Sequence, residues 1–136
     1  MLVIDAANVI GSRPTGWWRD RAGAARSFVD QVRSAVTTAR LDPPVVVVLE
    51  GRAREGAEAG VADGVAVLHA DGSGDDKLVD VIAEAAAAPV DGDAAADAAA
   101  EHGVTLVSAD RELRRRAEAL GAEVVGPRWL LERLAP

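Results

Sequence analysis

Three aspartates at the ends of apolar runs or turns are the side chains of this sequence best suited to chemistry. Asp5 closes the first apolar run (residues 2–4), Asp110 follows the run 104–107 after two intervening residues, and Asp75 follows a glycine-rich turn. Carboxylates that converge raise one another's pKa values unless a cation neutralises them. Because such a site offers only oxygen ligands and the chain has no cysteine, Mg²⁺ or Mn²⁺ suits it better than Zn²⁺.

Each of these aspartates also has a plain structural interpretation. Asp5 is compatible with an ordinary strand end, and Asp75 and Asp110 stand where helix N-caps are expected. Asn8 and Ser108 could orient a water or a phosphate oxygen, or serve only as turn residues. Two further candidates, Asp76 and Asp80, lie one turn apart on the flank of a predicted helix, where they either line the same cleft or face solvent.

Alternating strands and helices must position these residues. Apolar β-branched runs predict strands at 2–5, 45–49, 65–68, 104–107 and 123–125. Three- and four-residue spacing, alanine content and capping residues predict helices at 18–39, 75–88, 93–102, 110–120 and 127–134. Residues 8–16 and 50–64 are expected to be loops, the second with an alternative as a frayed helix.

This alternation predicts a doubly wound α/β fold: a central parallel sheet of about five strands in the order 3-2-1-4-5, flanked by helices. The length of 136 residues predicts one domain, 1–136. Strands one and four are then neighbours at the point where the strand order reverses. We therefore expect Asp5 and Asp110 to face each other at the carboxyl edge of the sheet.

Composition excludes several classes of site and of protein. The absence of cysteine excludes thiolate metal sites and cysteine nucleophiles, and two histidines leave little for imidazole-built sites. A net charge of −7 argues against a binder that holds nucleic acid by charge alone. No apolar run approaches the ~20 residues of a membrane span, and Asp5 interrupts any signal-peptide core, so we expect a cytoplasmic protein without membrane contact.

Other phosphate-handling families leave signatures that are missing here. A haloacid-dehalogenase phosphatase requires a second aspartate at the place of Ala7, and a response-regulator receiver requires an aspartate where His69 and Ala70 stand. Neither a dinucleotide-binding G-x-G-x-x-G after the first strand nor a P-loop is present.

Three stretches carry a resemblance to a known family. Residues 3–8 (VIDAAN), Asp75 with Asp80, and residues 107–110 (VSAD) stand in the order and at the strand ends typical of NYN domains. The chain resembles these domains of the PIN-like nuclease superfamily, and in particular their YacP-like branch, over nearly its whole length.

The resemblance implies a Rossmann-like PIN/NYN fold and a metal-dependent ribonuclease acting on RNA, for which we expect single strands. It implies that Mg²⁺ or Mn²⁺ is held by Asp5, Asp75 and Asp110, that Asn8 is a site residue, and that Asp76 or Asp80 supplies a fourth acidic position.

Basic and aromatic residues near the same edge are candidates for substrate binding. Arg13 and Arg52 stand beside glycines in the loops after strands one and two, where guanidinium groups could grip phosphate oxygens; solvated surface is the alternative. Trp18 matches the apolar stripe of the following helix, which leaves Trp17 to stack on a base, although core packing would explain both. Trp129 is expected in the core or at a homodimer contact.

Two rival functions use the same features. Hydrolysis of free nucleoside triphosphates, as by a pyrophosphohydrolase, would need the same carboxylates and metal without a groove for RNA. A degenerate domain would bind a nucleotide or a partner protein through Trp17 and Trp18.

Overall fold

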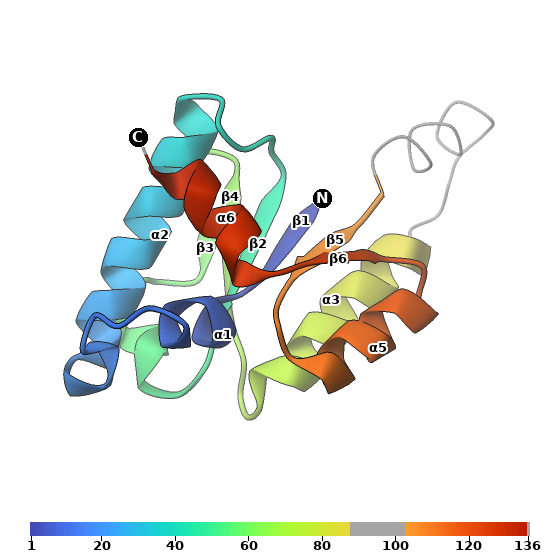
Figure 1. The fold of residues 1–136 in the computed structure, drawn as a ribbon, viewed down its shortest axis with the longest axis horizontal. Helices are drawn as coiled ribbons and strands as arrows, with labels where there is room; N and C mark the ends of the chain where they lie inside the picture. Colours follow the sequence, from blue (N-terminus) through green and yellow to red (C-terminus); the bar gives the residue numbers. More distant parts are fainter. Residues whose placement is uncertain (88–102, 136) are drawn as a thin grey trace.

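A twisted six-stranded sheet forms the centre of the protein in the computed structural model, which describes residues 1–87 and 103–135 (Figure 1). The strand order is β3-β4-β2-β1-β5-β6, and all neighbours pair in parallel except β3, which runs antiparallel to β4. The strands are β1 (Leu2–Asp5), β2 (Val45–Leu49), β3 (Gly60–Ala62), β4 (Val65–His69), β5 (Thr105–Val107) and β6 (Glu123–Val125). With β3 set aside, the other five strands have the predicted order 3-2-1-4-5.

Helices cover both faces of the sheet. They are α1 (Ala6–Gly11), α2 (Arg21–Thr37), α3 (Gly74–Ala87), α5 (Arg111–Ala119) and α6 (Pro127–Leu134), with 3₁₀ turns η1 (Trp17–Arg19) and η2 (Gly51–Gly56). Helices α1, α2 and α6 pack on one face and α3 and α5 on the other (Figure 1). Of the helices in the described ranges, none is long and apolar enough to cross a membrane.

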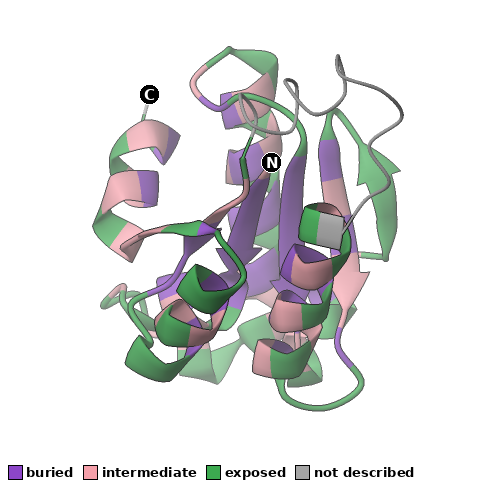
Figure 2. Ribbon diagram, turned by 90° about the vertical axis from the view of Figure 1, so that its right-hand side faces the viewer, coloured by how far each residue is buried: buried purple, intermediate pink, exposed green. Residues whose placement is uncertain are grey.

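The valine run of β2 explains why the sheet has two cores. All five residues of β2 are buried, as Figure 2 shows for the central strands. Val45, Val47 and Leu49 point into the core beneath α2, whereas Val46 and Val48 point into the core beneath α3 and α5. Alternate side chains of a strand face opposite sides, so a continuous apolar run suits a strand covered on both faces.

Two elements formed where loops were expected. Helix α1 begins directly after β1 because the Asp5 carboxylate accepts a hydrogen bond from the backbone N–H of Asn8 and caps it. Strand β3 is three exposed residues at the edge of the sheet, too short and too polar in context to show an alternating pattern. The helix expected at 93–102 lies outside the described residues.

The predicted start of the long helix at residue 18 is wrong. Asp20 accepts a hydrogen bond from the backbone N–H of Gly23 and caps α2, so the helix begins at Arg21. The two tryptophans therefore lie in the preceding turn η1, where helical periodicity does not apply. Contrary to expectation, Trp18 is 57% exposed, and Trp17 packs partly against the core.

Candidate functional site

Four carboxylates lie around the carboxyl edge of the sheet, and we call this group the acidic edge: Asp5, Glu50, Asp75 and Asp110. Asp5 ends β1, Glu50 directly follows β2, Asp75 lies in the first turn of α3, and Asp110 immediately precedes α5. Since β1 pairs with both β2 and β5, the chain topology brings these four segments to one edge. Only Glu50 was missing from the sequence-based prediction.

Asp5 is the buried member of the acidic edge, with 6% of its surface exposed. Its Oδ1 accepts the weak capping bond from Asn8 N at 3.3 Å, and its Oδ2 accepts a hydrogen bond from the Ser108 hydroxyl at 2.9 Å. Burial raises the pKa of Asp5 from 3.8 to about 6; the two hydrogen bonds oppose this, and the charges of Asp75 and Glu50 add to it. The protein thus holds a carboxylate where its charge is costly.

Ser108 and Asn8 tie the end of β1 to the loop after β5. The fully buried Ser108 hydroxyl donates to Asp5 and also accepts a hydrogen bond from the backbone N–H of Asp110 at 3.1 Å. The Asn8 Oδ1 accepts from the backbone N–H of Ala109 at 2.8 Å. Both residues therefore help to hold Asp5 and Asp110 in place.

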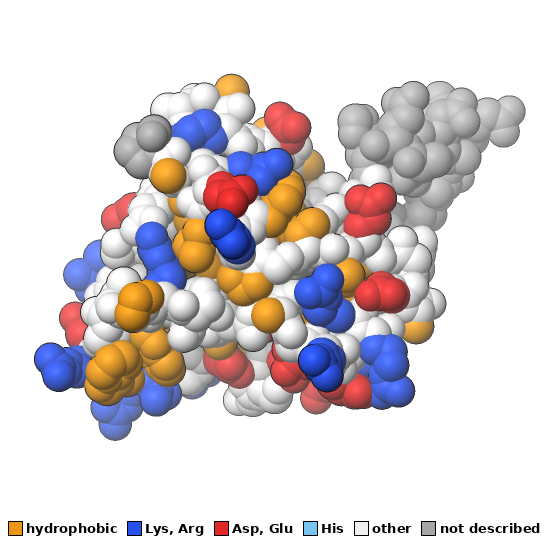
Figure 3. All heavy atoms as spheres, viewed as in Figure 1, with side chains coloured by type: hydrophobic (Ala, Val, Ile, Leu, Met, Phe, Trp, Pro, Cys, Tyr) orange, Lys and Arg blue, Asp and Glu red, His pale blue; other side chains and the backbone are white. Residues whose placement is uncertain are grey.

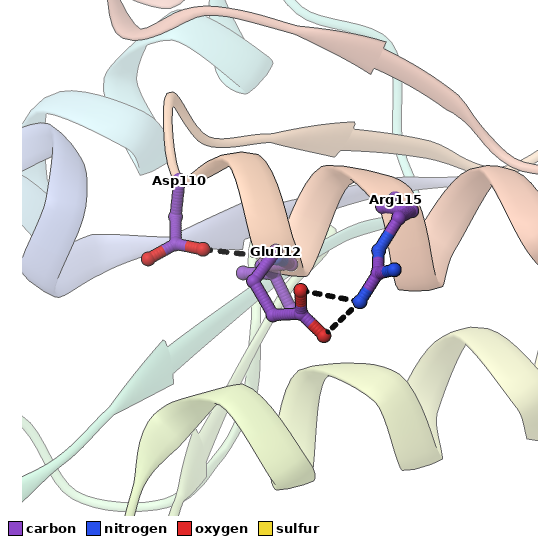
Figure 4. Close-up of polar contacts among 4 residues, drawn as sticks. Asp110, Glu112 and Arg115 are labelled. Atoms are coloured by element: carbon purple, nitrogen blue, oxygen red, sulfur yellow. Dashed lines mark hydrogen bonds and ion pairs between the residues drawn. The ribbon is translucent and has the colours of Figure 1, made fainter.

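Asp110 is an exposed N-cap, as its plain structural interpretation predicted. Its Oδ1 accepts a hydrogen bond from the backbone N–H of Leu113 at 2.9 Å (Figure 4). Glu112, two residues further on, forms an exposed ion pair with Arg115 of the same helix (Figure 4). The second oxygen of Asp110 points away from the helix in this view, and a cap can ligate through such an oxygen.

Asp75 is half-buried at the start of α3, as the helical periodicity predicted. Burial raises its pKa, the charges of Asp110 and Glu50 raise it further, Arg116 lowers it, and Asp76 raises it. The neighbouring Ser73 hydroxyl accepts from the Asp75 backbone N–H at 3.2 Å, so the Asp75 side chain is not needed as the cap.

Glu50 joins β2 to α3. Its Oε2 accepts a hydrogen bond from the backbone N–H of Gly74 at 2.5 Å, and a Cβ at position 74 would lie 3.2 Å from that oxygen. The charge of Glu50 raises the pKa of both Asp5 and Asp75. Its position in the sequence could have revealed it, because Glu50 directly follows the second predicted strand, just as Asp5 stands at the end of the first.

The other two acidic candidates lie on the surface of α3. Asp76 has a side chain 79% exposed and forms an ion pair with Arg116 of α5 at 3.2 Å. Asp80 is exposed, one turn further along. Asp76 acts on Asp75 only through its charge, and the structure gives Asp80 no hydrogen bond or ion pair within the described residues.

The donor set of the acidic edge matches a hard divalent cation in kind, because all four side chains offer carboxylate oxygens. Within residues 1–87 and 103–135, however, no three His, Asp or Glu side chains lie close enough to hold one ion as placed. The charges of the neighbouring carboxylates raise the pKa values of Asp5 and Asp75, but the four side chains do not surround a common point closely enough to bind one ion. The metal and its ligands therefore stay a prediction.

The arginine and tryptophan residues predicted to bind substrate differ in their contacts and in their exposure to solvent. Arg13 donates through Nη1 to Gln31 of α2 at 3.3 Å, so its guanidinium turns toward that helix. Arg52 is exposed on η2. Trp17 is partly buried, whereas Trp18 has the exposed ring that base stacking requires.

Comparison with known proteins shows which fold this is. Neither a protein-family model nor a curated protein matches the chain. Among solved structures, Rae1 (YacP) from Bacillus subtilis matches with a TM-score of 0.65 at 18% identity, over 98% of this chain and 72% of that one. Its W164L mutant matches with a TM-score of 0.63 at 16% identity, over 98% and 73% of the two chains. The chain has the fold of Rae1 (YacP). The expected α/β fold class, a central parallel sheet flanked by helices, is thereby confirmed.

Proposed function

We propose that this protein is a metal-dependent ribonuclease that hydrolyses RNA phosphodiester bonds at the acidic edge. The observation that carries the proposal is Asp5, a carboxylate buried at a strand end, with a pKa of about 6, beside Glu50 and Asp75. A buried carboxylate next to others of like charge costs stability, and such groups concentrate at functional sites. The fold shared with Rae1 (YacP) and the motifs typical of NYN domains support the same function.

The residues of the acidic edge that would hold Mg²⁺ or Mn²⁺ are Asp5, Asp75 and Asp110, joined by Glu50. Such an ion supplies an activated water and neutralises charge that develops on the phosphate. Asp5 must be ionised to bind it, and the hydrogen bond from Ser108 favours that ionised form. Asn8 holds the loop after β5 against α1, which keeps Asp110 near the end of β1.

The substrate we propose is single-stranded RNA. Exposed arginines on η1, α2 and η2 lie on the segments that follow β1 and β2, toward the edge where the acidic residues lie, and guanidinium groups bind phosphate oxygens. The overall charge of −7 makes local arginine placement, rather than net charge, the basis for binding.

The test is hydrolysis of labelled single-stranded RNA, structured RNA and free nucleoside triphosphates with Mn²⁺, Mg²⁺ or EDTA. We expect single-stranded RNA to be cleaved, and we expect EDTA to abolish this cleavage. Asp110→Asn should fold, because asparagine caps helices about as well as aspartate, but should lose activity. Asp30→Asn on the exposed surface of α2 is the matched control and should stay active.

Three outcomes contradict the proposal. Cleavage that persists in EDTA contradicts the dependence on a metal ion. An active Asp110→Asn variant contradicts the assignment of Asp110 to the site. Hydrolysis of triphosphates without cleavage of RNA assigns the acidic edge to nucleotide hydrolysis.

A further inference from the structure

A hollow between η1 and η2 combines exposed aromatic and basic side chains, and we call it the arginine–tryptophan hollow. It has a volume of about 590 Å³ and is lined by Trp18, Arg19, Arg21 and Arg52, with Asp20 and Glu55 also at its wall. Figure 3 shows hydrophobic side chains bordered by basic ones over the region of η1 and the first turn of α2, at the lower left.

Trp18 is exposed to solvent, and its ring is held in place by Trp17. Its ring meets that of Trp17 edge to face, with centroids 6.1 Å apart and planes at 88°. Trp17 is anchored against the core, so it fixes the position of Trp18 while leaving 57% of that residue exposed. The Arg19 guanidinium lies 5.9 Å from the Trp18 ring centroid. An exposed ring with a fixed position loses little conformational freedom when another flat group stacks on it.

Within the described part of the chain the arginines of the hollow form no ion pair, although two carboxylates, Asp20 and Glu55, line the same hollow. The ion pairs of residues 1–87 and 103–135 all lie elsewhere, on or between α3, α5 and α6: Arg115–Glu112, Arg116–Asp76 and Arg128–Glu132. None involves an arginine of η1, α2 or η2. Arg19 and Arg21 lie over the rings of Trp18 and Trp17. The three arginines of the hollow outnumber its two carboxylates, so a chain with net charge −7 keeps a local positive excess here, which favours an anionic ligand.

The hollow continues toward the acidic edge. A smaller cavity of about 200 Å³ is lined by Trp17, Arg21 and Glu50, together with apolar residues of α1 and η2. Arg21 lines both spaces, and Glu50 belongs to the acidic edge. A strand whose phosphate lies at the acidic edge would thus pass Arg21 before it reaches Trp18.

We propose that the arginine–tryptophan hollow is a subsite for single-stranded RNA away from the scissile bond, where a base stacks on Trp18 and the backbone phosphates bind Arg19, Arg21 and Arg52. The inference rests on the proposed ribonuclease function. Stacking requires a base that is free of its own neighbours, so duplex RNA does not fit this subsite.

Binding of a short fluorescent single-stranded RNA, measured in EDTA so that the RNA stays intact, tests the subsite. Trp18→Ala should weaken binding roughly 5- to 150-fold, the effect of removing one stacking aromatic, and Trp18→Phe should retain most of the affinity. Arg19→Ala and Arg52→Ala should each lower the slope of log affinity against log salt by about 0.7. The control Arg128→Ala, on the exposed surface of α6, should leave affinity and slope unchanged.

The outcomes separate this inference from the proposed function. Binding that Trp18→Ala leaves unchanged, in a variant that melts like the wild type, overturns the subsite even if the protein cleaves RNA. Equal binding of duplex RNA or of poly-glutamate through Trp18 also overturns it. Binding of single strands that depends on Trp18, in a protein that cleaves no RNA with Mn²⁺, supports the subsite and refutes the nuclease.

Discussion

Replacing Asp5 by asparagine should stabilise the metal-free protein at neutral pH. Burial raises the pKa of Asp5 from 3.8 to about 6, which means that the folded state disfavours its charge. At about 1.4 kcal/mol for each tenfold change in proton affinity, this corresponds to about 3 kcal/mol of lost stability once the group is ionised in both states. Asparagine has the same shape and no charge, and it can still accept from Asn8 N and donate toward Ser108, so we expect about 1 to 3 kcal/mol of stabilisation.

The stabilisation by Asp5→Asn should depend on pH, and its direction follows from the shifted pKa of Asp5. The pKa of Asp5 is higher in the folded than in the unfolded state, so between pH 3.8 and about 6 the folded state binds more protons. Stability contributed by this residue therefore falls as the pH rises through that window, and stays low above it. The advantage of Asp5→Asn should be small, about 0.5 kcal/mol, at pH 4 and should reach its full value by pH 7.

Urea unfolding followed by tryptophan fluorescence in EDTA, at pH 4, 5, 6 and 7, measures this difference. Asp30→Asn, an exposed substitution of the same kind, should stay within about 0.5 kcal/mol of the wild type at every pH. An Asp5→Asn variant that is less stable than the wild type at pH 7, or whose advantage is constant with pH, would refute the claim that burial of charge dominates this residue.

Three further outcomes follow from the site and its packing. Mn²⁺ at about 100 times its Kd should stabilise the wild type by about 2.7 kcal/mol in thermal melts and should not stabilise Asp5→Asn; equal shifts in both would separate the metal from Asp5. Ser108→Ala should cost about 1 to 3 kcal/mol in urea unfolding and raise the pKa of Asp5 further, because it removes a buried partner of that carboxylate; unchanged stability would contradict the network. Gly56→Ala should cost about 1 to 3 kcal/mol, since its Cβ would lie 2.2 Å from the carbonyl oxygen of Ala22, whereas Gly72→Ala, which faces open space, should be nearly neutral; equal losses would refute the packing argument.

The sheet was predictable because its strands are encoded by strong local signals. The run 45–49 has no polar residue, and each predicted strand is bounded by a turn or a helix signal, so the strand order followed from rules of chain connection. The six-residue helix after β1 and the three-residue β3 were missed because each spans fewer than two periods of its own hydrophobic pattern, so no repeat is visible in the sequence. They form because neighbouring structure caps or pairs them.

The placement of the candidate residues was predictable in part. Asp5 and Asp110 could be placed together because strand ends in parallel sheets share an edge, and Asp75 because helical periodicity turns it inward at the start of α3. Glu50 was missed because the loop that contains it has many charged residues, so a single carboxylate did not stand out. The roles of the two tryptophans were reversed, since the cap at Asp20 ends the helical periodicity two residues after Trp18 and no local pattern shows that break.

The hydrogen bonds that join β1 to the loop after β5 also bear on the order in which the protein is made. Asp5 and Ser108 are separated by 103 positions, and Asn8 and Ala109 by 101. A growing polypeptide emerges from its N-terminus, so the first aspartate is present long before its hydroxyl partner and before Asp110. The acidic edge can therefore assemble only once residues 108–110, which follow Asp5 by more than 100 positions, have been translated.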